Sequence, residues 1–434
     1  MFKSLSLLRL QRMVRGFLFV PAVMAICGLV MAGAAVSIDR MNVLGSAYDA
    51  LPFLNISTSG ARAVLGTIAG AMMTVISLVY SLTLVVFTLA AGNIGPRLLE
   101  TFTDNRVNQS TIGLLGATFL YSLFVLYVVG ENEVPRLSVA IAILLATTSF
   151  FWVVYFVHDT ARRVMVDNEI ARTQRSLRSA IDRLLADEPK EEPDDRNAIP
   201  DDEGEPVLAR TSGYVTAVQA EALLRNAVEY DGFVRVIARP GHFIIAGTPI
   251  AVLHRIAGDR EALAEAVHRS VLLADARSAD GDILFNVHLN VEIALRALSP
   301  GINDSYTAIS ALDQLSASLA IILQRGAPSS LITDKEDNPR VWLELIEVKE
   351  IVGTALHPMR RAASGNVMVV LRLIQAIGRM GLVCRGDHAA ILRTHLRLIA
   401  TDANIAVINR DDRAEVAHEL YKAHRILKDA DRRS

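Results

Sequence analysis

The sequence predicts an α-helical membrane domain with four transmembrane helices, followed by an α+β cytoplasmic domain that combines a small β module with C-terminal helices. Composition gives the first reason: mean hydropathy is +0.34, and 52% of the residues are hydrophobic although only 6% are aromatic. The second reason is a set of four long aliphatic runs early in the chain. The third is a later change from β-rich to helical patterns.

Four apolar runs within residues 1–158 are each long enough to cross the bilayer, whose hydrocarbon core takes roughly 20 helical residues. They comprise residues 17–38, 63–91, 111–129 and 137–157. None has a charged side chain in its interior, where a charge would cost about 3 kcal/mol. These runs predict a four-helix transmembrane domain.

Lysine and arginine near the span ends predict the orientation. Twelve lie on the side of the N-terminus, against three on the other side, Arg40, Arg62 and Arg136. Both termini are therefore expected in the cytoplasm. A cleavable signal peptide is the alternative for the first run, because a basic segment precedes it and the small-residue string MAGAAVS ends it.

The second span carries small and hydroxyl residues at helical spacing along one face. These residues are Thr67, Gly70, Thr74, Ser77, Ser81 and Thr88. One interpretation is close helix packing within or between subunits. The other is the lining of a pore or substrate path. Arg97, in the Gly-Pro segment after this span, is expected either in an interfacial turn or, with Arg106, in a basic ring at a pore mouth.

The segments after the fourth span predict a stalk, a linker and a β module. Residues 159–185 show helical periodicity with many arginines, which favours a helical stalk. Residues 186–206 contain ten acidic residues and four prolines, which is typical of a linker. Residues 207–256 are rich in Val, Ile and Gly and resemble half-motifs of a lipoyl- or biotinyl-type barrel. No lysine occurs between Lys190 and Lys335, so a swinging-arm carrier is excluded.

Residues 257–434 predict a mainly helical domain without a recognisable catalytic centre. Nucleotide-binding, nucleophile-elbow and zinc-protease motifs are missing from the sequence. Its histidines are scattered; His388 and His395 are seven residues apart and fit one helix face, but no carboxylate joins them at metal-ligand spacing. We therefore expect no metal, no cofactor and no enzyme activity. The net charge of −2 gives no reason to expect nucleic acid as a partner.

The most specific string in the chain is RALSPGINDSYTA, residues 296–308. It resembles the pattern of DUF2254, a family of bacterial membrane proteins, in which Arg-Ala-Leu-Ser-Pro-Gly-Ile-Asn-Asp-Pro is followed by Thr-Ala. Ser305 stands here where the family has proline. RSADGDILF, residues 277–285, and the second span with the following IGPRLLETF also resemble the family. The resemblance implies a bacterial inner-membrane protein, and it implies no substrate or catalytic residue.

The SPGIND part of this string has two interpretations. Pro-Gly ends one helix and Asn or Asp caps the next, which predicts a helix–helix corner. Alternatively, Asn303 and Asp304 offer oxygens to a ligand or ion, with Arg296 and Asp280 pairing nearby.

Three functions remain open from the sequence. The first is a homo-oligomeric channel or permeation protein, lined by the second span and gated by the cytoplasmic domain. The second is a non-conducting scaffold or ligand-sensing protein anchored in the lipid bilayer. The third is a membrane-surface enzyme with its site at the SPGIND corner. A small ion or ligand of unknown identity is a possible partner in each case.

Overall fold

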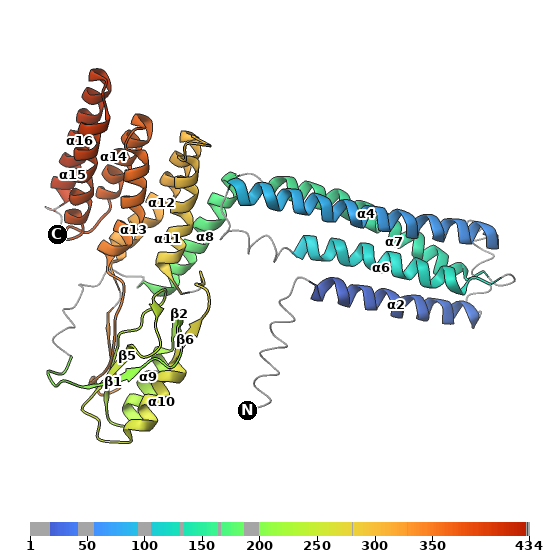
Figure 1. Ribbon diagram of the computed structural model, residues 1–434, viewed down its shortest axis with the longest axis horizontal. Helices are drawn as coiled ribbons and strands as arrows, with labels where there is room; N and C mark the ends of the chain where they lie inside the picture. The colour runs from blue at the N-terminus through green and yellow to red at the C-terminus, as the bar shows by residue number, and fades with distance from the viewer. Residues whose placement is uncertain are drawn as a thin grey trace. The chain divides into compact units, whose positions relative to one another are not determined.

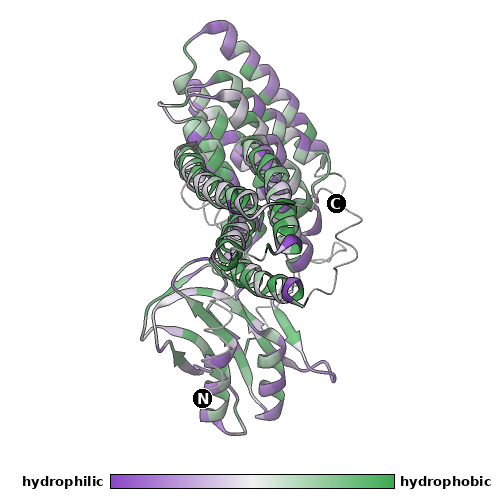
Figure 2. Ribbon diagram, turned by 90° about the vertical axis from the view of Figure 1, so that its right-hand side faces the viewer, coloured by the Kyte–Doolittle hydropathy of each residue, from purple (hydrophilic) through white to green (hydrophobic). Residues whose placement is uncertain are grey.

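The chain forms two compact units, Met1–Asn168 and Glu169–Ser434, and each is described here by itself. The structure is a computed structural model that describes residues 18–41, 56–93, 106–130, 134–163, 166–185, 199–279, 281–327, 329–430 and 432. Figure 1 labels the elements, and Figure 2 colours the chain by the hydropathy of each residue.

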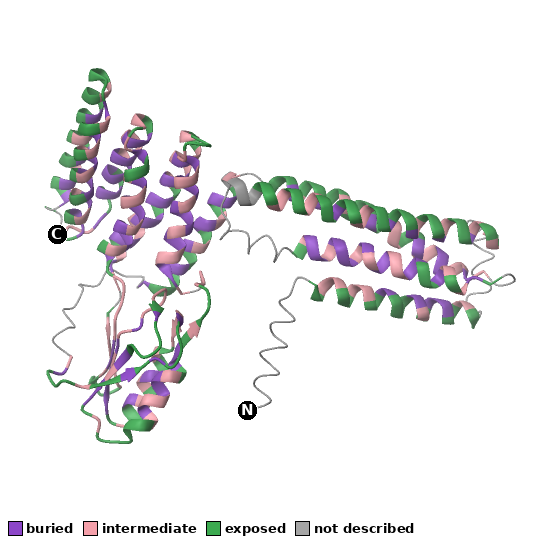
Figure 3. Cartoon of the chain, viewed as in Figure 1, coloured by how far each residue is buried: buried purple, intermediate pink, exposed green. Residues whose placement is uncertain are grey.

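The described residues of the first unit form four long helices, as the apolar runs predict. They are α2 (Phe19–Arg40), α4 (Thr58–Asn93), α6 (Arg106–Val128) and α7 (Arg136–Arg163). Helix α6 packs against the other three and has the most buried surface (Figure 3). Tyr121 on α6 is fully buried in this unit.

Small residues bring α2 and α6 close together. A Cβ atom added to Gly28 would lie 2.9 Å from the carbonyl oxygen of Ala117, so only glycine permits this approach. Polar groups within the unit are also paired. Asp39, at the end of α2, accepts hydrogen bonds from the backbone N–H groups of Leu137 and Ser138 at 3.0 and 2.9 Å. The C-terminal turn of α2 thereby caps the first turn of α7.

Five described helices are long and apolar enough to cross a membrane, so the expected count of four is not exact. The fifth is α12 (Ser305–Arg325), which lies in the second unit. Residues 305–325 were expected within the mainly helical cytoplasmic domain of residues 257–434. Length and composition alone do not distinguish a buried apolar helix of a large domain from a membrane span.

The helical part of the second unit is built from successive helix pairs (Figure 1). Its helices are α8 (Val166–Leu184), α11 (Ile283–Ala297), α12, α13 (Val348–Ala363), α14 (Val367–Gly381), α15 (Ala389–Ala406) and α16 (Arg410–Ala430). Helices α11, α13 and α15 pack in one row, and α12, α14 and α16 in a second row beside it. Their buried faces follow the spacing of three and four residues that the sequence shows.

Helix α8 packs on α11 and α12 through polar side chains. Thr173 donates a hydrogen bond to Asn290 at 2.9 Å, and Ser176 donates one to Asn286 at 2.8 Å. The Gln174 amide lies 2.7 Å from the Ser318 hydroxyl. The helical segment expected as a stalk is therefore integrated into the helical part by buried hydrogen bonds, which are costly to leave unmade.

Two sheets and two helices form the β region. The five-stranded sheet has the order β1 (Glu205–Leu208), β5 (Pro249–His254), β3 (Phe233–Val236), β8 (Pro339–Leu343), β7 (Leu331–Thr333). The three-stranded sheet has the order β4 (Phe243–Ile244), β2 (Gly213–Val218), β6 (Val271–Ala274). Helices α9 (Ala220–Glu229) and α10 (Arg260–Ser270) complete the region.

The β region extends beyond residues 207–256. Strand β8 pairs in parallel with β3, so that Val341 faces Val234, and β6 pairs with β2. A single apolar core contains residues of both sheets, including Val215, Leu253 and Val341. Strand β8 therefore joins this core only after the chain has passed through α11 and α12.

Candidate functional site

The hydroxyl face of α4 points away from the other described helices of its own unit. All six stripe residues are exposed in the single chain. Leu65, Met72 and Val79 instead form the buried face of α4. Thr67, Thr74, Ser77 and Thr88 each donate a hydrogen bond to the backbone carbonyl four residues earlier. These four hydroxyls are thus satisfied within the helix, and the exposed stripe is available to lipid or to a second chain. Arg97 lies outside the described residues.

The SPGIND corner is a capped turn between α11 and α12. Asp304 accepts hydrogen bonds from the Thr307 backbone N–H at 3.0 Å and from the Thr307 hydroxyl at 2.6 Å. The hydrogen bond from the Thr307 hydroxyl has the larger effect and the one from the backbone N–H the smaller, and both hold the pKa of the Asp304 carboxyl below its usual value. Asn303 adopts a left-handed φ of 49°. The carbonyl of Arg296 accepts a hydrogen bond from Ser299 at 2.6 Å.

These contacts account for the corner as structure, and a ligand role for Arg296, Asn303 and Asp304 stays a prediction. Asp280, the fourth residue proposed for that role, lies outside the described residues.

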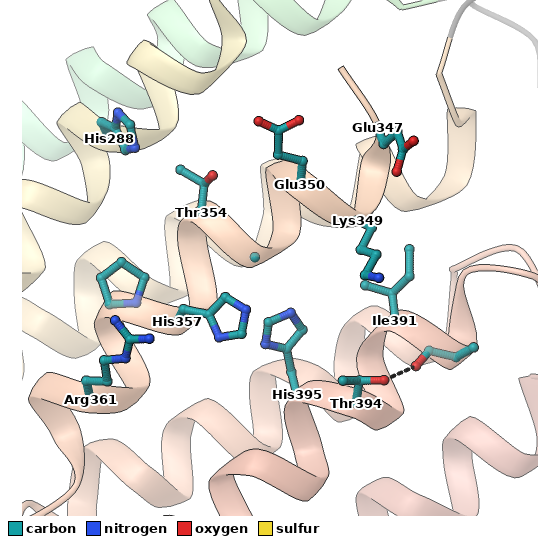
Figure 4. Close-up of a pocket in the computed structure, with 13 residues that line it drawn as sticks. His288, Glu347, Lys349, Glu350, Thr354, His357, Arg361, Ile391, Thr394 and His395 are labelled. Atoms are coloured by element: carbon teal, nitrogen blue, oxygen red, sulfur yellow. Dashed lines mark hydrogen bonds between the residues drawn. The ribbon is translucent and has the colours of Figure 1, made fainter. Parts of the chain in front are cut away.

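A cavity of about 770 Å³ lies in the helical part of the second unit, between α11, α13 and α15. Its volume is within the range of small-molecule sites. Figure 4 shows how three helices supply its polar lining. The principal polar residues are His288, Glu350, Thr354, His357, Arg361 and His395.

Two histidines contact each other in the wall of the cavity. The rings of His357 and His395 have centroids 4.6 Å apart with an interplanar angle of 54° (Figure 4). The side chain of His395 is only 4% exposed. The Nδ1 atoms of both rings are buried and have no hydrogen-bond partner among the described residues. Buried polar atoms without partners are uncommon in proteins, and a water molecule or a ligand group can supply the missing partner.

The electrostatic surroundings keep both histidines neutral near pH 7. Burial, followed by the neighbouring His357 and Arg360, lowers the pKa of His395 to about 4. Burial, followed by Arg360 and Arg361, lowers the pKa of His357. In each case only cationic or neutral neighbours contribute besides burial. This end of the cavity therefore has a positive field and two neutral imidazoles.

The opposite end of the cavity connects with the β region. Glu350 pairs with Arg239 at 2.5 Å, and Arg239 also donates a hydrogen bond to His242 at 2.5 Å. Arg239 and His242 flank Pro240-Gly241, the turn before β4. Burial and the charge of Arg239 lower the pKa of His242. The first turn of α13 is thus tied to the β region by a charged hydrogen bond.

A second link runs through α11. Asp282 caps this helix by accepting a hydrogen bond from Phe285 at 2.9 Å, and it pairs with Arg277 at 2.7 Å. Arg277 also lies 3.3 Å from Nδ1 of His288, which lines the cavity. Gly241 has a φ of +90°, and a Cβ atom there would lie 2.4 Å from an Asp282 oxygen. Glycine is therefore required for the close approach of this turn to α11.

Sequence reasoning missed this cavity because its residues come from distant segments. The sequence paired His395 with His388, whereas the structure places His388 at the start of α15, with Nδ1 2.7 Å from the Leu323 carbonyl oxygen. One local signal was available. Glu350, Thr354, His357 and Arg361 recur at spacings of three and four residues and mark a polar face on α13.

Comparisons with known proteins identify a family. The family model described as "Predicted membrane protein (DUF2254)" matches residues 15–379. The chain is 26% identical over 397 residues to three mycobacterial proteins, in an alignment that covers 88% of this chain and 75% of each relative. They are the "Uncharacterized protein Mb1321c" of Mycobacterium bovis and the "Uncharacterized protein MT1328" and "Uncharacterized protein Rv1290c" of two Mycobacterium tuberculosis strains. No solved structure matches the chain. Since the family model covers well over half of the sequence, the chain belongs to the DUF2254 family of predicted membrane proteins.

Proposed function

We propose that this protein is a membrane-anchored ligand-binding protein, in which the helical part of the second unit binds a small molecule between α11, α13 and α15. The observation that carries this proposal is the cavity of about 770 Å³ with His395 buried in its wall. An imidazole nitrogen buried without a partner is stabilised when a ligand supplies one. The links from Glu350 and His288 to the β region give the bound state a route to affect a second surface.

Native mass spectrometry of the full-length protein, purified in detergent from its own host, tests this proposal. Wild-type protein is expected to carry an adduct of constant small mass. Ala390→Trp fills the cavity from an exposed lining position and should abolish the adduct. Ala362→Trp introduces the same side chain at an exposed position of α13 outside the lining and should retain it. An adduct that survives in Ala390→Trp, or none on the wild type, would contradict the proposal.

A second candidate function, a homo-oligomeric channel or permeation protein, is favoured by the α4 stripe. The spacing of three, four and seven residues along the stripe is typical of the contact face of helices in a left-handed coiled coil. The stripe residues are exposed in the single chain. Small residues allow membrane helices to approach closely, so a second copy of α4 is a suitable partner. In such an oligomer the hydroxyls would border the path between subunits.

Measuring the mass of the solubilised protein and the ion flux of liposomes that contain it tests this second candidate. Ser77→Leu and Ser81→Leu widen the seam and are expected to reduce oligomer formation or flux. Met73→Leu changes a neighbouring exposed position outside the stripe and should have no effect. If the wild-type protein is monomeric and its liposomes show no ion flux, the channel function is contradicted, and the stripe on α4 faces lipid.

We also infer that, of the described helices, only α2, α4, α6 and α7 cross the membrane. We further infer that this membrane is the bacterial inner membrane and that both termini lie in the cytoplasm. Helix α12 carries Asp313, which pairs with Arg372 at 2.5 Å and Arg379 at 2.6 Å. Ion pairs of this kind on a helix surface suit water better than hydrocarbon. To test whether α12 lies in water, Gln314 on this helix is replaced by cysteine in a background without the native cysteines. If α12 lies outside the bilayer, Gln314→Cys should react with a membrane-impermeant maleimide once the membranes have been broken open to expose both faces. A reporter fused after Ser434 that is active only in the periplasm would contradict the orientation.

A further inference from the structure

We propose that the histidine end of the cavity binds an oxyanion, a phosphate or carboxylate group, of a small molecule whose remainder extends toward Glu350. This inference rests on the proposed ligand-binding function and specifies its chemistry. The residues that would hold the oxyanion are His357, His395, Arg361 and Thr354.

The charges around the histidine pair favour an anion. Arg361 follows His357 by one helical turn on the same face of α13 and lines the cavity beside it (Figure 4). Among the described residues Arg361 has no carboxylate within ion-pair distance, whereas Arg360 is paired with Asp402. The exposed guanidinium of Arg361 thus borders the cavity, and no described carboxylate pairs with it. Guanidinium groups bind carboxylate and phosphate through two parallel hydrogen bonds.

The hydrogen-bonding groups at this end also suit an oxyanion. A neutral imidazole donates one hydrogen bond and accepts another, and its donor nitrogen can point at an acceptor in the cavity. His357 on α13 and His395 on α15 approach from two sides, so both reach the same ligand group. Thr354, one turn before His357, adds a hydroxyl to the same wall. The Thr394 hydroxyl is used within α15, where it donates to the Ala390 carbonyl at 3.0 Å.

A divalent metal fits this end less well. Histidines are common metal ligands. However, the charged side chains that act on this pair are Arg360 and Arg361, and both would repel a cation. Within the described ranges, no group of three or more His, Cys, Asp or Glu side chains is arranged to hold a metal. The carboxylates of the lining, Glu347 and Glu350, belong to the first turn of α13, two turns or more from the Arg361 end. They are placed to accept hydrogen bonds from hydroxyl or amino groups of the ligand body.

Isothermal titration of the full-length protein in detergent at pH 6.5 tests this inference. The probes are inorganic phosphate and succinate as oxyanions, glycerol as a neutral control and Zn²⁺ as a cation. We expect phosphate or succinate to bind the wild type. Arg361→Gln and His395→Gln should each weaken that binding about tenfold or more, as loss of a charged or buried hydrogen bond does. Arg397→Gln removes the same charge from an exposed position of α15 outside the lining and should bind like the wild type.

The possible results separate this inference from the proposed function. Oxyanion binding that Arg361→Gln weakens and Arg397→Gln leaves unchanged supports it. Zn²⁺ binding without oxyanion binding overturns the oxyanion assignment. A cavity-dependent adduct in the mass spectrum, together with no oxyanion binding, also overturns it while the ligand-binding function stands. If neither an adduct nor a probe binds, both proposals fail. His395→Asn, which keeps a polar side chain of smaller size, provides a second variant should His395→Gln not fold.

Discussion

Protonation of His395 should destabilise the second unit in acid. The folded chain holds the pKa of this histidine at about 4, compared with 6.5 for the free side chain, because it is buried beside His357 and Arg360. Between these two values the unfolded chain binds a proton that the folded chain does not. The free energy of unfolding therefore falls as the pH falls through this window. The stabilising contribution of the neutral His395 is fully present above pH 6.5.

The magnitude follows from the two pKa values. Each tenfold difference in proton affinity corresponds to ~1.4 kcal/mol, so traversing the whole window costs ~3 kcal/mol. Most of this loss, about 2 kcal/mol, falls between pH 7 and pH 4.5. That is a large part of the roughly 5–15 kcal/mol by which domains are stable. His357, His242 and His268 also have lowered pKa values, so the wild type should lose more than the His395 contribution alone.

The His395→Gln variant isolates this contribution. Urea unfolding of the full-length protein in detergent, followed by circular dichroism in phosphate-free buffers at pH 7 and pH 4.5, gives the free energy at each pH. The variant is expected to lose about 2 kcal/mol less than the wild type across this interval. His424→Gln, at an exposed position of α16, controls for removal of an imidazole. Equal losses in wild type and His395→Gln would refute the assignment of this histidine as buried and neutral.

Three further predictions concern packing. Gly28→Leu should lower the melting temperature of the first unit in detergent, at a cost of about 1–3 kcal/mol, because Ala117 occupies the space; Gly33→Leu, with nothing within 4 Å, should not. Asp39→Asn should cost about 1 kcal/mol in the same assay through loss of the charged cap on α7, and an unchanged melting temperature would contradict that role. Gly241→Ala should destabilise the second unit toward urea more than Gly247→Ala, since both have positive φ but only Gly241 approaches Asp282 closely.

The sequence predicts the membrane helices well because their signal is local. The second span was expected at residues 63–91, and α4 occupies Thr58–Asn93. A run of apolar residues identifies its own position without reference to any distant segment. The same property explains why five described helices, and not four, have the length and composition of a span, because α12 resembles a span in both although it packs within the second unit.

The β region and the cavity depend on distant segments, which limits what one sequence predicts. Strand β8 joins β3 in parallel only after more than a hundred residues, and no periodicity within PRVWL indicates that partner. Helix α9 was missed within a segment rich in β-formers; its buried Leu223 and Ala227 are four residues apart, which is a helical spacing. His357 and His395 have no sequence relation that predicts their contact.

The placement of α13 connects the wall of the cavity to the β region. Strand β8 ends at Leu343, and α13 begins at Val348, so the wall that carries His357 continues almost directly into the five-stranded sheet. The Arg239–Glu350 pair fixes the start of that wall. A displacement of α13 by a bound molecule must therefore either break this pair or move the turn before β4 with it. If the pair is kept, the turn before β4 moves with α13, so we expect a molecule that displaces α13 to alter the β region as well.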